Sequence, residues 1–309
     1  MSDGPLPSGS TTRGSTASGS TTSGSIDAVA DLVVAPDGRE IAFVRWGGGA
    51  GVPVLLLHGV TDSAECWGSV VRHLAGGRPV VAVDARGHGR TPLGDEPFTI
   101  GALASDAAEV LRAIGGVPAL VVGHSLGGVV AEELALTEPG LVAGLVLEDP
   151  AWDTGEPTPG RAPELLQGWL AMFAGVPAGE LERWARRENP TWPDDEVVPW
   201  ARSKTQVDQR LGRIAHDWHG RDWVEALVQL RCPVTLVTGD QARGSIVGMA
   251  QVGRATALLG DLLVHVPIAG VGHSVRHEGL ATYLAAVDDA LARIDFSDEG
   301  HVPPDGARP

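Results

Sequence analysis

The sequence predicts an α/β fold, a mostly parallel sheet with helices on both faces and one helical insertion. From Val52 onward, short apolar runs alternate with stretches of helical periodicity, which is typical of parallel strands joined by crossover helices. The chain has 309 residues, 43% of them hydrophobic, which is enough for one large domain with an insertion. Between Pro150 and about Gln229 the alternation breaks into short helical pieces separated by Pro and Gly. Seven of the nine tryptophans lie there.

The expected elements follow from apolar spacing. Two β-rich runs, 31–35 and 40–44, flank the turn residues at 36–38 and predict a hairpin. Buried strands are predicted from apolar runs at 54–57, 80–83, 120–122, 141–147, 234–238 and 262–266. Helices are predicted over 65–74, 103–114 and 280–294, and directly after Ser125. The glycines at 47–49 precede a strand, so they indicate a loop and not a dinucleotide-binding motif.

The predicted organisation is a core formed by residues 26–149 and 223–296, interrupted by a helical segment over 150–222. Residues 1–25 are rich in Gly, Ser and Thr, which cannot bury enough apolar area to offset the entropy of ordering, so we expect a flexible tail. Residues 297–309 are polar and expected to fray. The N-terminal stretch has no apolar segment typical of a secretory signal, and no run could span a bilayer. We therefore expect a soluble cytoplasmic protein.

Charge and cysteine content narrow the classes of partner. The formal net charge of −16 argues against nucleic acid and anionic membranes, because the long-range field repels both. The two cysteines, Cys66 and Cys232, imply no disulfide framework and are expected to be small buried side chains. A small-molecule partner is the remaining expectation, and the sequence leaves the oligomeric state open.

The most informative stretch is LVVGHSLGG at residues 120–128. Three apolar residues run into a serine between two glycines, and an amphipathic stretch follows at once. This pattern predicts a strand that turns sharply into a helix with Ser125 at the apex. The first helical N–H groups would then face whatever the hydroxyl attacks. The stretch resembles the nucleophile elbow, G-x-S-x-G, of the α/β-hydrolase fold family.

This resemblance implies roles for several residues. A serine needs a base, and His273 lies in GVGHS at 270–274, between the last strand and the last helix, where the family carries its histidine. The oxyanion hole would use the main-chain N–H groups of Leu126 and of Val60, which follows His58-Gly59. Residues 84–90 (DARGHGR) also match a family turn, for which we expect a structural role. His58, His88 and His124 occupy family motifs as neighbours of the site, not as bases.

The acid is the point at which this chain departs from the commonest family pattern. Most relatives carry the acid three residues after the glycine that ends the penultimate strand, and here that position is Ala242. Asp240 is adjacent but is expected to point elsewhere. The zearalenone lactonases carry a glutamate two residues before a proline, and Glu148 matches that position. Glu148 is therefore the predicted acid, with Asp149 and Asp240 as alternatives.

The predicted function is hydrolysis of a carboxylic ester or lactone by a Ser125–His273–Glu148 triad, without metal or organic cofactor. His216 and His219 have a spacing that could bind metal, but no cluster of companion ligands is evident nearby. In the resembled family a helical cap occupies the position of the insertion. Its many tryptophans suit an apolar or aromatic substrate, and Trp192, between two prolines, is predicted to line the pocket above Ser125. Alternatives are a C–C bond hydrolase, an acyltransferase of the same fold, or a ligand receptor without turnover.

Overall fold

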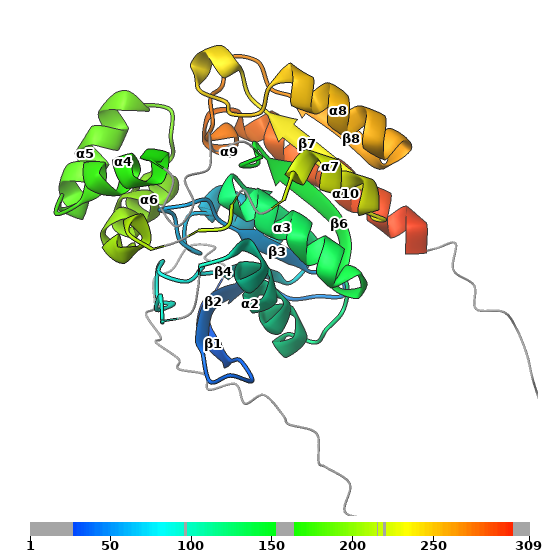
Figure 1. The fold of residues 1–309 in the computed structure, drawn as a ribbon, viewed down its shortest axis with the longest axis horizontal. Coiled ribbons are helices and arrows are strands. Elements are labelled where there is room, and N and C mark those ends of the chain that lie inside the picture. The colour runs from blue at the N-terminus through cyan, green and yellow to red at the C-terminus, as the bar shows by residue number, and fades with distance from the viewer. Residues whose placement is uncertain (1–26, 96–97, 153–163, 215, 219–220, 299–309) are drawn as a thin grey trace, which may run out of the picture.

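The computed structural model describes residues 27–95, 98–152, 164–214, 216–218 and 221–298 (Figure 1). The predicted tail at 1–25 and residues 299–309 lie outside these ranges. Within them, the strands are β1 (Ala28–Val34), β2 (Glu40–Trp46), β3 (Val54–Leu57), β4 (Val80–Val83), β5 (Ala119–His124), β6 (Val142–Glu148), β7 (Val234–Thr238) and β8 (Leu263–Pro267). They form one eight-stranded sheet in the order β1-β2-β4-β3-β5-β6-β7-β8.

The described helices connect and flank these strands. They are α1 (Gly68–Leu74), α2 (Ile100–Ala113), α3 (Leu126–Thr137), α4 (Glu164–Phe173), α5 (Ala178–Glu188), α6 (Asp194–Gln206), α7 (Trp223–Ala226), α8 (Met249–Leu259), α9 (Val275–Glu278) and α10 (Leu280–Asp298). Short 3₁₀ turns are found at Pro139–Leu141, Gln209–Gly212, Leu227–Gln229, Gln241–Arg243 and Gly260–Leu262.

The sheet is mostly parallel, as the sequence predicted. β1 pairs antiparallel with β2 over the predicted hairpin, and β2 pairs antiparallel with β4. All pairings from β4 through β8 are parallel. The carboxyl ends of β3, β5 and β6 therefore meet at one edge of the sheet, where the catalytic groups are expected.

Each central strand contributes side chains to two separate cores, one on each face of the sheet. In β3, Leu55 and Leu57 belong to the core shared with α2 and α3, whereas Val54 and Leu56 belong to the core shared with α1 and α10. The alternation reflects the two-residue period of a strand. Because both faces are covered, the strands are continuous apolar runs and not alternating ones, which is the pattern that the sequence showed.

Some elements differ from the prediction. The helix expected over 65–74 begins at Gly68, because residues 64–67 form a turn in which the Ala64 N–H bonds the Asp84 carboxylate. Helix α8 was not predicted; its Val252, Ala255 and Leu259 lie on one buried face. Helix α10 continues to Asp298, past the position at which fraying was expected to begin.

The insertion between β6 and β7 contains α4, α5 and α6, which form a separate group beside the sheet (Figure 1). We call these three helices the cap. They share a small core of their own, built from Phe173, Leu181, Ala185, Val197, Trp200 and Ala201. Within the described ranges, no helix combines the length and apolarity needed to cross a bilayer.

Candidate active site

Ser125 lies at the apex of the predicted elbow, between β5 and α3. Its φ of 52° and ψ of −114° place it in a region that residues with a side chain rarely adopt. The turn closes so tightly that a Cβ on Gly123 would lie 2.1 Å from the Gly127 carbonyl oxygen, and one on Gly127 would lie 2.0 Å from the Leu57 carbonyl oxygen. Only glycine fits at both positions, which explains the G-x-S-x-G spacing.

The acid that contacts His273 is Asp149. Its Oδ2 lies 2.7 Å from His273 Nδ1, and the carboxylate is fully buried. Three further donors hold it: the Ser245 hydroxyl at 2.7 Å and the backbone N–H groups of Ile246 and Val247 at 2.9 and 3.1 Å. With Nδ1 directed at the carboxylate, the other ring nitrogen of His273 is left to act as a base.

The expectation that Glu148 supplies this acid is wrong. The Glu148 carboxylate accepts hydrogen bonds from the backbone N–H and the guanidinium of Arg276, at 2.8 and 3.1 Å. Consecutive residues at a strand end point to opposite faces, and Asp149, with φ of 40°, turns out of the strand toward His273. The proline two residues after Glu148 carried no information about which of the two carboxylates faces the histidine.

Asp240 points away from the site, as expected. Its Oδ2 accepts a hydrogen bond from the Gly270 N–H at 2.5 Å, so it fixes the loop that precedes His273 without touching the ring. What distinguishes Asp149 is its contact with residues 245–247, whose donors hold its carboxylate. That segment lies almost 100 positions away in the chain and carries no motif of its own.

A cavity of about 290 Å³ brings three of the predicted site residues together. Ser125, His273 and Val60 line it, and so do the cap residues Trp169, Phe173, Trp200 and Lys204. Ser125 and His273 share this cavity, although the described residues show no hydrogen bond between their side chains. The N–H groups of Val60 and of Leu126, the first residue of α3, have no hydrogen-bond partner in the described part of the chain. Both therefore remain available to an oxyanion.

Trp192 does not line this cavity, contrary to the prediction. It packs behind Trp200, with ring centroids 5.9 Å apart, and against His277 at 4.3 Å. The prolines on either side of Thr191-Trp192 do place it before α6, whose first residue is Asp194. However, the pocket wall is formed by residues of α4 and α6 themselves, namely Trp169, Phe173 and Trp200.

Two buried histidines brace the loops around the site. His58 Nδ1 donates to the Gly59 carbonyl at 2.8 Å, and its Nε2 accepts from the Ala85 N–H at 3.0 Å. His88 likewise donates to the Arg86 carbonyl and accepts from the Thr61 N–H at 3.1 Å. Burial lowers the pKa of His58, and it lowers the pKa of His88 to about 3, so both rings stay neutral. They act as structural neighbours of the site, as predicted.

The turn at 84–90 also has the structural role that was expected. The Asp84 carboxylate accepts from the N–H groups of Ala64 and Arg90, at 2.8 and 3.0 Å. Arg90 in turn donates to the Phe43 carbonyl at 2.8 Å. The turn thus ties β2 to the segment that follows β3.

His124 supports the loop that carries His273. Its Nε2 donates to the His273 carbonyl oxygen at 3.1 Å, and the two rings lie 4.7 Å apart. Burial, together with the Arg276 charge, holds the pKa of His124 well below its usual value, so the ring is neutral. A Cβ on Gly59 would lie 2.7 Å from His124 Nδ1, which explains the glycine directly before Val60.

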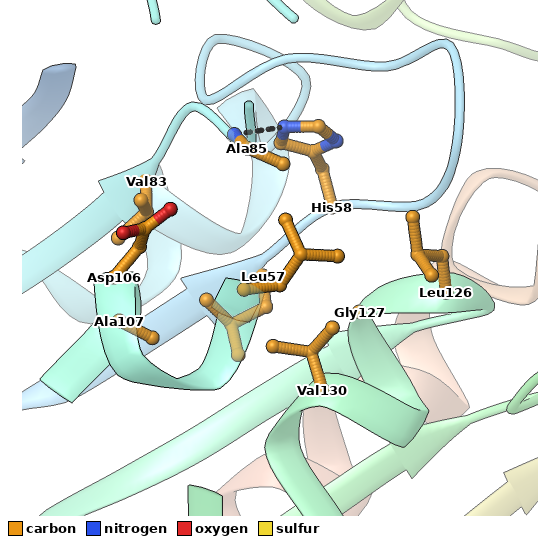
Figure 2. A pocket seen from close by; sticks show the side chains of 10 residues that line it. Leu57, His58, Val83, Ala85, Asp106, Ala107, Leu126, Gly127 and Val130 are labelled. Atoms are coloured by element: carbon orange, nitrogen blue, oxygen red, sulfur yellow. Dashed lines mark hydrogen bonds between the residues drawn. The ribbon is translucent and has the colours of Figure 1, made fainter. Parts of the chain in front are cut away.

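A second and much smaller cavity lies beneath the elbow (Figure 2). Leu57, Leu126 and Val130 point into it from β3 and α3, opposite Asp106 and Ala107 of α2. Its volume of about 20 Å³ has room for about one water molecule, and Ser125 and His273 do not line it. This cavity belongs to the packing between α2, α3 and the sheet, not to the catalytic site.

The histidines considered for metal binding have other surroundings. His216 Nε2 lies 2.7 Å from the Leu211 carbonyl, and its ring contacts Phe98 and Trp218; His219 lies outside the described residues. Among the residues that the structure describes, no group of three or more His, Cys, Asp or Glu side chains is placed to hold a metal ion. Cys66 is buried, and burial raises its pKa to about 12, whereas Cys232 is only partly buried.

Comparison with known proteins identifies the family. Residues 54–287 match the sequence profile of the alpha/beta hydrolase family. The chain belongs to this family. Among curated members, the lipase LipV of Mycobacterium tuberculosis is 45% identical over 107 residues, which are 35% of this chain and 40% of LipV. The chain therefore aligns with less than half the length of that relative.

Solved structures of the family share the fold of this member over most of its length. The esterase RhEst1 from Rhodococcus sp. ECU1013 superposes with a TM-score of 0.66 at 24% identity, covering 86% of this chain and 99% of RhEst1. An N-formylmaleamic acid deformylase from Pseudomonas putida S16 gives a TM-score of 0.67 at 24% identity, covering 83% of this chain and 98% of the deformylase. At such identities the likeness concerns the fold alone.

Proposed function

We propose that this family member is a serine hydrolase that cleaves a carboxylic ester or lactone with an apolar or aromatic group. The observation that carries the proposal is the strained Ser125 in one cavity with His273, whose Nδ1 is bound by the buried Asp149 carboxylate. A serine at such an apex, a histidine and an orienting acid are the parts required for acyl transfer. The similarity to lipases and esterases supports the same reaction class.

The reaction divides into two acyl transfers. His273 removes the proton of the Ser125 hydroxyl as its oxygen attacks the substrate carbonyl carbon, and the N–H groups of Val60 and Leu126 hold the resulting oxyanion. When the intermediate collapses, the C–O bond breaks and His273 donates its proton to the leaving alcohol. Water then attacks the acyl-enzyme by the same route, which releases the acid and restores Ser125. Asp149 keeps the ring in the required tautomer throughout.

The substrate class is inferred from the cavity wall. Trp169, Phe173 and Trp200 line the same cavity as Ser125, so an apolar or aromatic group of the substrate would bind beside them. The volume of about 290 Å³ suits a small ester or a single-ring lactone. These three residues, and not Trp192, are therefore the proposed contacts for the apolar or aromatic group of the substrate.

A fluorophosphonate probe tests the nucleophile. Both Ser125 and Ser274 line the cavity, which provides a matched control. We expect the parent protein and Ser274→Ala to be labelled, and Ser125→Ala to remain unlabelled. Equal labelling of parent and Ser125→Ala would overturn the serine mechanism. Incubation of the purified protein with p-nitrophenyl esters, aromatic lactones, vinylogous diketones and an added alcohol acceptor then separates ester hydrolysis from C–C bond cleavage and acyl transfer. No turnover of any of these would favour a ligand receptor.

A further inference from the structure

Lys204 is a buried cation that links the cap to the loop carrying Val60. It lies on α6, and only 2% of its side chain is exposed. Its ammonium donates to the Thr61 carbonyl oxygen at 3.1 Å and forms an ion pair with the Asp62 carboxylate. The rings of Trp200 and Phe173 cover it, with their centroids 4.8 and 5.7 Å from Nζ. The ammonium thus contacts consecutive residues of a single loop.

The buried charge of the Lys204 ammonium is neutralised by the neighbouring Asp62 carboxylate. Burial alone would raise the pKa of the Asp62 carboxyl, but the charges of Lys204 and Arg276 outweigh this effect and hold the pKa well below its usual value. Asp62 is therefore an anion and Lys204 its counter-ion. The aromatic faces add a favourable cation–π contact. Such a pair fixes a geometry, because a buried charge needs a partner close by; without Lys204, Asp62 would keep the longer contact with the Arg276 guanidinium, at 3.4 Å.

The loop that Lys204 holds is strained. Residues 59–62 form a turn closed by the Asp62 N–H to the Gly59 carbonyl at 3.1 Å, and Thr61 at its third position has a φ of 71°. A β-branched residue is disfavoured in that region and persists there only when its surroundings fix it. The Thr61 N–H is bound by His88 of the core, whereas its carbonyl is bound by Lys204 of the cap.

This turn also determines where the Val60 N–H points. Val60 is the second residue of the turn, so the peptide groups held by His88 and Lys204 directly follow the group that would bind the oxyanion. The core supplies one of these two contacts and the cap supplies the other. An oxyanion hole depends on donors fixed in advance, since reorientation during the reaction would forfeit most of their effect.

We propose that Lys204 is a positioning residue that holds the turn at 59–62, so that the Val60 amide is correctly placed only when the cap is seated. The proposal rests on the proposed hydrolase function. It explains why the cap carries a buried charge at the cavity: an apolar side chain could fill the space but could not bind the Thr61 carbonyl and the Asp62 carboxylate together.

The experiment compares Lys204→Met with Arg202→Met. Arg202 lies on the same helix and also joins the cap to the core, through Glu65 at 2.9 Å, but it does not touch the turn. With p-nitrophenyl acetate, we expect Lys204→Met to lower kcat about 10²-fold, with KM changed less than threefold. Affinity for a trifluoromethyl ketone should fall by the same factor as kcat/KM. Arg202→Met should leave all three quantities within about twofold of the parent.

Two results would overturn the proposal. One is a kcat for Lys204→Met equal to that of Arg202→Met; the other is a loss confined to KM, which would make Lys204 a substrate contact. Should Lys204→Met fail to fold, Asp62→Asn/Lys204→Met removes both charges of the pair, and the same fall in kcat is expected. Fluorophosphonate labelling of Ser125, run to completion, distinguishes failure of the hydrolase proposal from failure of the positioning proposal. An unlabelled parent protein would refute the hydrolase, whereas a labelled but slow Lys204→Met supports the positioning role.

Discussion

The elbow around Ser125 and the contact between the cap and the core are built from different kinds of interaction. Around Ser125 the geometry is set by backbone contacts, since Gly123 and Gly127 leave no space for a Cβ. Where the cap meets the core, buried charges set the geometry: Lys204 binds Asp62, and Glu196 binds the Ser69 N–H at 2.6 Å and His277 at 3.1 Å. The first arrangement is rigid because close-packed backbone cannot yield. The second is specific because each buried charge needs its own partner.

This difference implies different responses to mutation. Substitutions at the elbow should distort the site or unfold the core, because no neighbouring atom can move away. Substitutions in the cap should change substrate preference or the placement of the oxyanion turn while the core remains folded, since the cap has its own small core. The following predictions test this contrast, beginning with the largest expected effect.

The two adjacent carboxylates at the end of β6 should have opposite phenotypes. Asp149→Asn is expected to lower kcat about 10⁴-fold, because an amide no longer stabilises the required tautomer and charge of His273. Glu148→Gln weakens the buried contact with Arg276 and should mainly cost stability, roughly 3 kcal/mol. Steady-state kinetics at equal folded fraction, checked by circular dichroism, measures both effects. A greater loss of kcat in Glu148→Gln would restore Glu148 as the acid.

Glycine-to-alanine substitutions should change the free energy of unfolding in opposite directions in the elbow and in the cap. In Gly123→Ala the new Cβ would lie 2.1 Å from the Gly127 carbonyl oxygen, so the free energy of unfolding should fall by about 3 kcal/mol. Gly168→Ala, inside α4 of the cap, has no heavy atom within 4 Å of the new Cβ and should gain about 0.5–1 kcal/mol from helix propensity. Urea unfolding of both variants measures these changes. Equal destabilisation would show that steric fit does not distinguish the two regions.

Alanine substitutions of two tryptophans in the insertion should have different effects on substrate binding. Trp200 lines the cavity, and we expect Trp200→Ala to raise KM for a bulky aromatic ester about tenfold, with little change for an acetate ester. Trp192 lies behind it, so Trp192→Ala should affect both esters equally and lower the melting temperature. Selective loss of the aromatic substrate in Trp192→Ala would instead support the original assignment of Trp192 to the pocket.

The last prediction concerns the pH dependence that Glu132, on α3, gives to stability. Its carboxylate is fully buried and accepts a hydrogen bond from Trp152 Nε1 at 2.9 Å, at the start of the insertion. Burial raises its pKa to about 8, from an ordinary value of 4.5. The folded state therefore keeps a proton that the unfolded chain has lost between these two pH values. Stability should fall as pH rises through this window, by at most about 1.4 kcal/mol per pH unit from this group.

Glu132→Gln should remove this pH dependence, because the amide stays neutral in both states. Urea unfolding at pH 5 and at pH 8 gives the slope for parent and variant. The variant should lose less stability than the parent between these two values. An identical slope in both proteins would mean that Glu132 is ionised in the folded state and that other groups account for the dependence.

The sequence alone determined the parts of this protein that depend on local geometry. Apolar runs and helical spacing identified the strands and most helices of the core, and G-x-S-x-G located Ser125, because a sharp strand-to-helix turn has few sequence solutions. The family resemblance pointed to His273, between the last strand and the last helix, as the proposed base. Helix α8 was missed because its apolar face is narrow, with buried residues only at Val252, Ala255 and Leu259.

The tertiary structure decided every choice between neighbouring candidates. Glu148 and Asp149 are adjacent carboxylates, and which of them meets His273 depends on Arg276 and on the loop at 245–247, which approach from distant parts of the chain. Trp192 and Trp200 are close in sequence, but the way the cap helices pack puts only Trp200 at the cavity. Lys204 carries no motif, and its contact with the Val60 turn exists only once α6 is seated. Long-range contacts of this kind leave no local pattern, because each partner constrains the other only in the folded chain.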